Sequence, residues 1–177
     1  MPSNVVIIGP PGSGKTSAGT ALAKRLGVPF FDTDDLIEKQ ESMKVHEIFS
    51  RDGEAGFRKL ERQLLEKLAC PETDQGQFVM ATGGGIAVAP GNFELLTKIG
   101  TVVCLRASAG CLAVRLVGDS SRPLLASESS NLSEKEKKLD ELLAARAAVY
   151  GRAPYAVHTD NLEPAQVAEA IEAMLAL

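Results

Sequence analysis

The stretch Gly9-Pro10-Pro11-Gly12-Ser13-Gly14-Lys15-Thr16 follows directly on the apolar run Val5–Ile8. It fits the pattern GxxxxGK[ST], in which glycines let backbone N–H groups turn inward around an anion. The helix expected from Lys15 points the positive end of its dipole at the same place. Lys15 can reach the outer phosphates of a nucleotide, and the Thr16 hydroxyl is placed to bind Mg²⁺. The stretch therefore predicts a phosphate-binding loop for a nucleoside triphosphate, rather than a glycine-rich turn with an unrelated lysine. Its expected nucleotide-binding residues are Gly12, Ser13, Gly14, Lys15, Thr16 and Ser17.

Short apolar runs alternate with helical patterns along the rest of the chain. Several runs are apolar at consecutive positions, which is typical of strands covered on both faces. We expect strands at Val5–Ile8, Pro29–Phe31, Phe78–Ala81, Val102–Leu105 and Tyr155–His158. We expect helices at Lys15–Leu26, Glu54–Cys70, Ser108–Val117, Ser133–Val149 (with Ser133 and Glu136 as its capping box) and Pro164–Leu177. This alternation predicts an α/β fold of three layers, α/β/α, with a five-stranded parallel sheet in the middle.

The composition narrows the class of protein. The length of 177 residues fits one domain over residues 1–177. The net charge of -4 argues against a general nucleic-acid binder. No apolar run is long enough to cross a bilayer, and no basic leader precedes the first strand. Its three cysteines, Cys70, Cys104 and Cys111, contain no CxxC pair and fit a reducing compartment. His46 and His158 are expected to be ordinary surface or strand residues. We expect a cytoplasmic monomer with no membrane partner.

Acidic residues follow the second expected strand, in Phe31-Asp32-Thr33-Asp34-Asp35. Ligands of open parallel sheets lie at the carboxyl ends of the strands, so these carboxylates should lie near the phosphates. One of them can face Mg²⁺, and the other can orient an acceptor hydroxyl or take its proton. Capping of a following helix is the alternative, and Asp35 fits first-turn helix charge. Because no other acidic residue clearly ends a strand, Asp32 is the expected metal ligand beside Thr16.

Two further segments are candidates for the site. The strand Phe78–Ala81 leads through Thr82 into Gly83-Gly84-Gly85, where glycine permits either close approach to a ligand or a tight exit from the strand. The segment Ser120–Ser133 is rich in serine, contains Arg122 and has few apolar anchors, so we expect a mobile lid.

Taken together, the motifs between Val5 and about Asp160 resemble the shikimate kinase family. The resemblance rests on the order of the phosphate loop, Asp32-Thr33-Asp34, Ile48-Phe49, Gly53-Glu54, Phe57-Arg58, the glycine triplet, Arg122-Pro123-Leu124-Leu125, and Arg146 ahead of Tyr150. It implies a P-loop kinase fold that uses ATP and Mg²⁺, with an acceptor-binding segment at about 33–61 and a lid at about 115–133. The implied reaction is phosphorylation of the 3-hydroxyl of shikimate.

The resemblance also implies roles for individual residues. It implies that Arg58 and Arg146 bind the shikimate carboxylate, because their planar guanidinium groups match a carboxylate. Glu61 can hold Arg58 in place. The remaining implied ring and hydroxyl contacts are Asp34, Gly83, Gly84, Gly85, Phe49 and Phe57. The implied catalytic residues are Lys15, Asp34 and Arg122, and Arg122 would lie on a lid that closes over the transferred phosphate. Arg115 is expected near the adenine.

Some features leave alternatives open. The segment Ala126–Ser133 has no clear family pattern, and Asp160-Asn161-Leu162 stand where some members carry an arginine near the nucleotide. Either arginine of the acceptor pair could instead be a plain exposed helix charge. Another small-molecule kinase, of the gluconate or nucleoside monophosphate type, is the nearest rival. A catalytically silent nucleotide-binding regulator is the other.

Overall fold

The computed structural model describes residues 4–70, 76–117 and 132–177 of the chain. Within these ranges five strands form one sheet in the order β2-β3-β1-β4-β5, and every neighbouring pair is parallel. The strands are β1 (Val5–Ile8), β2 (Phe30–Asp32), β3 (Val79–Ala81), β4 (Thr101–Arg106) and β5 (Tyr155–His158). The expected α/β/α fold with a five-stranded parallel sheet is confirmed.

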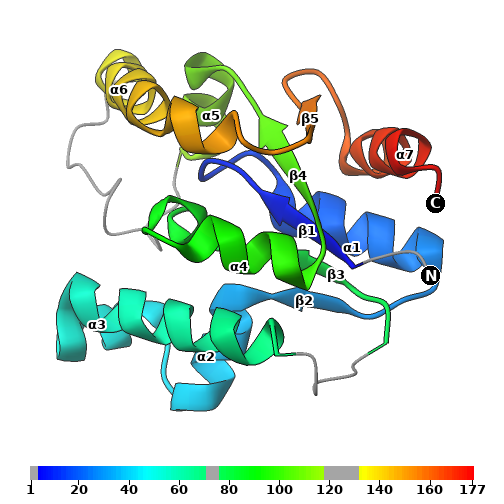
Figure 1. Cartoon of the computed structure of the whole chain (residues 1–177). Coiled ribbons are helices and arrows are strands. Elements are labelled where there is room, and N and C mark those ends of the chain that lie inside the picture. The colour runs from blue at the N-terminus through cyan, green and yellow to red at the C-terminus, as the bar shows by residue number, and fades with distance from the viewer. Residues whose placement is uncertain (1–3, 71–75, 118–131) are drawn as a thin grey trace.

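Helices cover both faces of the sheet (Figure 1). One layer contains α1 (Lys15–Leu26) and α7 (Pro164–Leu175), whose apolar residues share a core cluster with β1 and β4. The other contains α3 (Val45–Leu68) and α4 (Asn92–Ile99), which pack on the opposite face. The connecting helices are α2 (Thr33–Glu41), η1 (Ile86–Val88), α5 (Ala109–Arg115) and α6 (Leu132–Tyr150).

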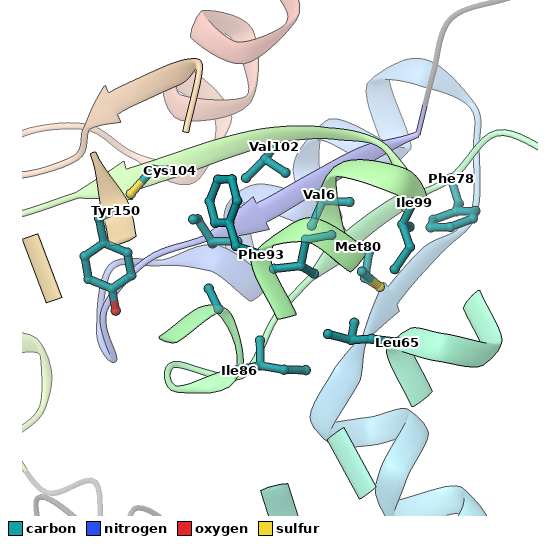
Figure 2. Close-up of a cluster of buried hydrophobic side chains, with 13 residues drawn as sticks. Val6, Leu65, Phe78, Met80, Ile86, Phe93, Ile99, Val102, Cys104 and Tyr150 are labelled. Carbon is teal, nitrogen blue, oxygen red and sulfur yellow. The ribbon is translucent and has the colours of Figure 1, made fainter. Parts of the chain in front are cut away.

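Strand side chains alternate between the two layers, which explains the apolar runs in the sequence. In β1, Val6 and Ile8 belong to the cluster beneath α3 and α4, whereas Val5 and Ile7 belong to the cluster beneath α1 and α7. Figure 2 shows the first cluster, in which Met80 of β3 and Phe93 of α4 pack around Val6. Burial of each such side chain contributes about 1.5–3 kcal/mol, so the sheet forms a rigid platform for its loops.

Several helix boundaries differ from expectation. Helix α6 already includes Leu132, so the prediction of Ser133 as its capping residue is wrong, and Ser133 lies in the first turn. Helices α2 and α4 were not predicted as separate elements, although Asp35 does lie in the first turn of α2, as expected. Helix α3 begins nine residues earlier than expected, at Val45 rather than Glu54, because two helical segments join at a kink.

Candidate active site

Two adjoining cavities open at the carboxyl edge of the sheet. The first, of about 440 Å³, lies over the phosphate loop. The second, of about 450 Å³, lies between α2, α3, the glycine triplet and α6. Asp34, at the start of α2, lines both of them. The edge of the sheet therefore holds two binding spaces with a carboxylate at their junction.

The first cavity contains every predicted nucleotide-binding residue that the structure describes. It is lined by Gly12, Ser13, Gly14, Lys15, Thr16, Ser17, Asp32 and Arg115. Lys15 is 6% exposed, and its Nζ donates to the Pro10 carbonyl at 2.8 Å, so its ammonium group is held within the loop. Arg122 lies outside the described residues, as does most of the expected lid.

Asp32 has two partners in this cavity. Its Oδ2 accepts a hydrogen bond from Thr16 Oγ1 at 2.8 Å, and its Oδ1 accepts from the Asp34 backbone N–H at 3.0 Å. The second bond caps α2. The two interpretations of Asp32, as helix cap and as candidate metal ligand, are therefore compatible, because each uses a different carboxylate oxygen.

Arg115 joins the two sides of the nucleotide cavity. Its Nη2 donates to the Thr159 carbonyl at 2.5 Å, and its Nη1 donates to Thr159 Oγ1 at 3.1 Å and to the Gly12 carbonyl at 3.5 Å. The segment after β5 also lines the cavity. Thr159, Glu163 and Pro164 at the start of α7 were not identified from the sequence, and Leu162 belongs to the segment whose nucleotide contacts the sequence left open.

The second cavity contains the predicted acceptor residues. It is lined by Asp34, Phe49, Phe57, Arg58, Gly83, Gly84, Gly85 and Arg146. Arg146 reaches it from α6, where its Nη1 donates to the Gly84 carbonyl at 2.6 Å. Arg58 reaches it from α3 and pairs with Glu61 at 2.8 Å and with Glu54 at 3.0 Å. Two guanidinium groups from distant parts of the chain thus line one cavity together with an aromatic pair, an arrangement suited to a small carboxylic acid.

The glycine triplet makes room for the side chains of the site. A Cβ atom on Gly83 would lie 2.5 Å from Asp34 Oδ1, and one on Gly85 would lie 2.7 Å from Arg58 Nη1. A Cβ on Gly84 would lie 2.9 Å from Pro11 of the phosphate loop. Side chains on the triplet would therefore displace the carboxylate, the guanidinium group or the loop. The packing of the site's own side chains thus gives a third reason for the glycines, beside the two that the sequence suggested.

Some lining residues were missed from the sequence. The second cavity is also lined by Lys44, which precedes α3, and by Val45 and His46 in the first turn of that helix, so the exposed His46 lies beside the site. Lys44 pairs with Glu38 at 2.8 Å, and that pair lowers the pKa of the Glu38 carboxyl. These residues lie at the start of α3, a helix that the sequence led us to expect only from Glu54, so no sequence signal marked them as cavity lining.

Glu61 is a buried carboxyl group within this cavity. It is 1% exposed, and burial raises its pKa to about 7, an effect that Arg58 opposes and the nearby Asp34 carboxylate reinforces. A carboxyl group with this pKa changes charge near neutral pH beside a predicted substrate-binding arginine.

This shift predicts a pH dependence of stability. Between pH 4.5 and about 7 the folded chain binds more protons at Glu61 than the unfolded chain does, so the free energy of unfolding falls as pH rises. In Glu61→Gln that fall is absent, and the variant should gain about 3 kcal/mol relative to the original chain between pH 4.5 and pH 8. Urea denaturation across this range measures it. Glu66→Gln, which changes an exposed carboxylate of the same helix, is the control. Parallel pH curves for the original chain and Glu61→Gln would contradict the assignment.

A break in α3 builds one wall of the second cavity. Phe49 and Phe57 are eight residues apart, which corresponds to about 12 Å along a straight helix. Their ring centroids are nevertheless only 4.8 Å apart, because Gly53 has φ 68° and ψ -176° and turns the chain between them. This backbone region is essentially restricted to glycine. The break brings the aromatic pair and Arg58 to the same cavity.

Replacing Gly53 tests the importance of the break. Gly53→Ala should lower the free energy of unfolding by about 3 kcal/mol, because alanine must adopt a glycine-only backbone conformation. Gly27→Ala is a close control. Gly27 also has φ 68° but a ψ of 29°, and an added Cβ would meet nothing within 4 Å at either glycine. The control should cost only about 1 kcal/mol. If both variants lost the same free energy of unfolding in urea denaturation, alanine would be no more strained at the break than at the left-handed position of Gly27.

Two further properties concern the described residues only. None of the helices in this part of the chain is both long and apolar enough to cross a membrane. No group of three or more His, Cys, Asp or Glu residues that could hold a metal ion occurs among them.

Comparisons with known proteins identify the family of the chain. The family model for shikimate kinase matches residues 11–176. A shikimate kinase from Thermodesulfovibrio yellowstonii is 42% identical over 168 residues, which covers 95% of this chain and 92% of the relative. The structure of shikimate kinase from Acinetobacter baumannii in complex with shikimate matches with a TM-score of 0.88 and 34% identity, over 99% of this chain and 94% of the other. A gluconokinase from Sinorhizobium meliloti, at 21% identity and a TM-score of 0.59 over 99% and 92% of the two chains, shares the fold. The chain therefore belongs to the shikimate kinase family.

Proposed function

We propose that this chain transfers the γ-phosphoryl group of ATP to the 3-hydroxyl of shikimate, giving shikimate 3-phosphate and ADP. One observation carries the proposal beyond family membership, namely that Asp34 lines both the phosphate-loop cavity and the cavity that holds the two arginines. A carboxylate at that junction is where an acceptor hydroxyl must meet the terminal phosphate.

The second cavity suits the chemistry of shikimate, a cyclohexene carboxylate with three hydroxyl groups. Arg58 and Arg146 bind the carboxylate through charge-assisted hydrogen bonds. Phe49 and Phe57 form the wall against the ring, while the triplet backbone and Asp34 face the hydroxyls. These three kinds of contact hold the acceptor in one orientation, which can remove much of the entropic part of the activation barrier to phosphoryl transfer.

The transfer step follows from this placement. Asp34 orients the 3-hydroxyl and takes its proton as the oxygen attacks the γ-phosphorus. The bond from that phosphorus to the bridging oxygen breaks, and ADP leaves. Lys15 and the loop N–H groups stabilise the negative charge that develops on the phosphate oxygens, and Arg122, which lies outside the described residues, would add positive charge.

Thr16 and Asp32 are the residues that would hold Mg²⁺. The hydroxyl and the carboxylate lie 2.8 Å apart, and both are the hard oxygen donors that Mg²⁺ prefers. This ion takes only one or two protein ligands beside substrate phosphates and water, so a larger cluster of acidic residues is not required. When bound, it would neutralise charge on the phosphates of ATP.

The remaining parts of the proposal concern the molecule as a whole. We propose a single P-loop kinase domain over residues 1–177 that acts as a cytoplasmic monomer. A net charge of -4 supports the absence of a nucleic-acid partner.

An acceptor screen tests the function. Purified protein with ATP and Mg²⁺ should release ADP when shikimate is added, and far less with gluconate, AMP or no acceptor. ADP release driven by gluconate or AMP would replace the acceptor assignment with the rival one. The absence of shikimate-dependent ADP release would overturn the proposal.

A further inference from the structure

Thr159, the residue that follows β5, lies at the crossing of three elements around the nucleotide cavity. Its side chain is 1% exposed, and the residue lines the cavity beside Arg115. Its Oγ1 lies 3.2 Å from the Ser13 carbonyl of the phosphate loop, 3.1 Å from Arg115 Nη1 and 3.3 Å from the Arg106 carbonyl at the end of β4. This buried hydroxyl thus connects Thr159 with Ser13, which lies 146 positions earlier in the sequence.

The donor and acceptor pattern assigns the hydroxyl proton. Arg115 carries only donors, so the Thr159 oxygen accepts from it. The Arg106 carbonyl already accepts the Thr159 backbone N–H at 2.8 Å. The Ser13 carbonyl is therefore the better acceptor for the single O–H proton. The hydroxyl donates one hydrogen bond to the phosphate loop and accepts one from Arg115.

The Ser13 carbonyl is a sensitive point of the loop. In a planar trans peptide the C=O and the following N–H point in opposite directions. Fixing the Ser13 carbonyl toward Thr159 therefore fixes the Gly14 N–H away from Thr159. Gly14 lines the cavity and has φ 88° and ψ 18°, a left-handed conformation of the kind from which anion-binding concavities are built.

We propose that Thr159 is a positioning residue for nucleotide binding, whose hydroxyl fixes the orientations of the Ser13–Gly14 peptide and of the Arg115 guanidinium beside the nucleotide cavity. The inference rests on the proposed function only for the identity of the nucleotide as ATP. The segment after β5 thereby has two roles, because it forms a wall of the cavity and also sets the direction of a loop N–H group. Because Thr159 acts through Gly14 and Arg115, its loss should affect the nucleotide and not the acceptor.

The test compares Thr159→Val, which keeps the shape and removes the hydroxyl, with Thr159→Ser, which keeps the hydroxyl. Thr101→Val makes the same chemical change at the opposite end of the sheet and is the matched control. Calorimetry with ATP in the absence of shikimate should show binding weakened about tenfold in Thr159→Val, since the buried Ser13 carbonyl loses its donor and the Arg115 guanidinium loses one acceptor. Thr159→Ser should stay within about twofold of the original chain, because it preserves both hydrogen bonds.

Two readouts separate positioning from a general loss of structure. The KM for ATP should rise in Thr159→Val while the KM for shikimate stays unchanged. The Gly14 amide signal in a ¹H–¹⁵N spectrum should shift in Thr159→Val and return in Thr159→Ser. If Thr159→Val does not fold, Thr159→Ala replaces it with the same expectations.

Three results would overturn the inference. They are unchanged ATP affinity in the hydroxyl-free variant, an equal loss of ATP and shikimate affinity, or no rescue by serine. Because ATP binding is measured without an acceptor, these results stand apart from the acceptor screen. A chain that binds ATP without shikimate-dependent turnover would end the proposed function and leave the Thr159 test intact.

Discussion

In Asp34→Asn, kcat for shikimate-dependent ADP release should fall by roughly 10²–10⁴, the range for loss of a general base. Asparagine has nearly the same shape but does not take the proton of the acceptor hydroxyl. The bond that caps α2 uses the Asp34 backbone N–H and the Asp32 carboxylate, so the substitution leaves the start of the helix intact. Affinity for ATP should therefore change little. Steady-state kinetics with both substrates, together with ATP calorimetry, measure the two effects separately.

Asp140→Asn is the control, because it makes the same change at an exposed position on α6. An unchanged kcat in Asp34→Asn would remove Asp34 from the mechanism, whatever its position between the cavities. The same pair of proteins addresses the silent-regulator alternative. A nucleotide-binding regulator has no shikimate-dependent turnover to lose, so any measurable kcat in the original chain, sharply reduced in the variant, decides against it.

The parts of the fold that could be predicted depend on local sequence. The phosphate loop is a contiguous motif whose glycines, lysine and threonine act within a few residues of each other. The five strands could be predicted because both faces of the sheet are covered and their apolar runs are continuous. Helix α4 was missed although Phe93, Leu96 and Ile99 repeat at helical spacing and are buried, so a usable signal was present in the sequence.

Other features depend on contacts that no local pattern reveals. The break at Gly53 was not predicted because glycine inside a helical pattern has several explanations, and only the Phe49–Phe57 contact distinguishes them. The raised pKa of Glu61 arises from its burial among elements distant in the sequence. The Asp34 carboxylate of α2 adds to the rise, whereas Arg58 of the same helix opposes it. Thr159 carried no motif at all. Its importance follows from the place where β5 ends, beside a loop at the other end of the chain.

The candidate site shows the same division. Residue types in the family motifs selected many residues that line the two cavities, because motif order indicates which segments meet at the sheet edge, but they did not select Lys44 or Thr159. The roles of Arg58 and Arg146 could not be separated from the sequence, since both are helix arginines assigned to one carboxylate. The structure shows a difference between them. Arg58 pairs with Glu61 and Glu54, whereas Arg146 donates to the Gly84 carbonyl.

That difference makes Arg146→Ala the cleaner test of the acceptor. The KM for shikimate should rise by about 10–100-fold, which corresponds to the loss of charge-assisted hydrogen bonds of about 1.5–3 kcal/mol. The KM for ATP should stay nearly constant, because Arg146 lines only the second cavity. Arg146→Lys keeps the charge but loses the planar fork of the guanidinium group. Its KM for shikimate should lie between those of the original chain and Arg146→Ala. Lys138→Ala, an exposed change on the same helix, is the control.

Arg58→Ala should weaken shikimate binding by a similar factor and also lower stability, because it leaves the buried Glu61 without its counter-ion. The double variant Arg58→Ala/Glu61→Gln separates the effect on stability from the effect on shikimate binding. It removes the unpaired Glu61 charge but does not restore the guanidinium group that binds the shikimate carboxylate. At pH 8 its free energy of unfolding should exceed that of Arg58→Ala, while its KM for shikimate stays high. If both single arginine variants kept the original affinity for shikimate, the carboxylate would bind elsewhere. Recovery of shikimate affinity in the double variant would instead mean that Arg58 acts only by neutralising Glu61, not by holding the acceptor.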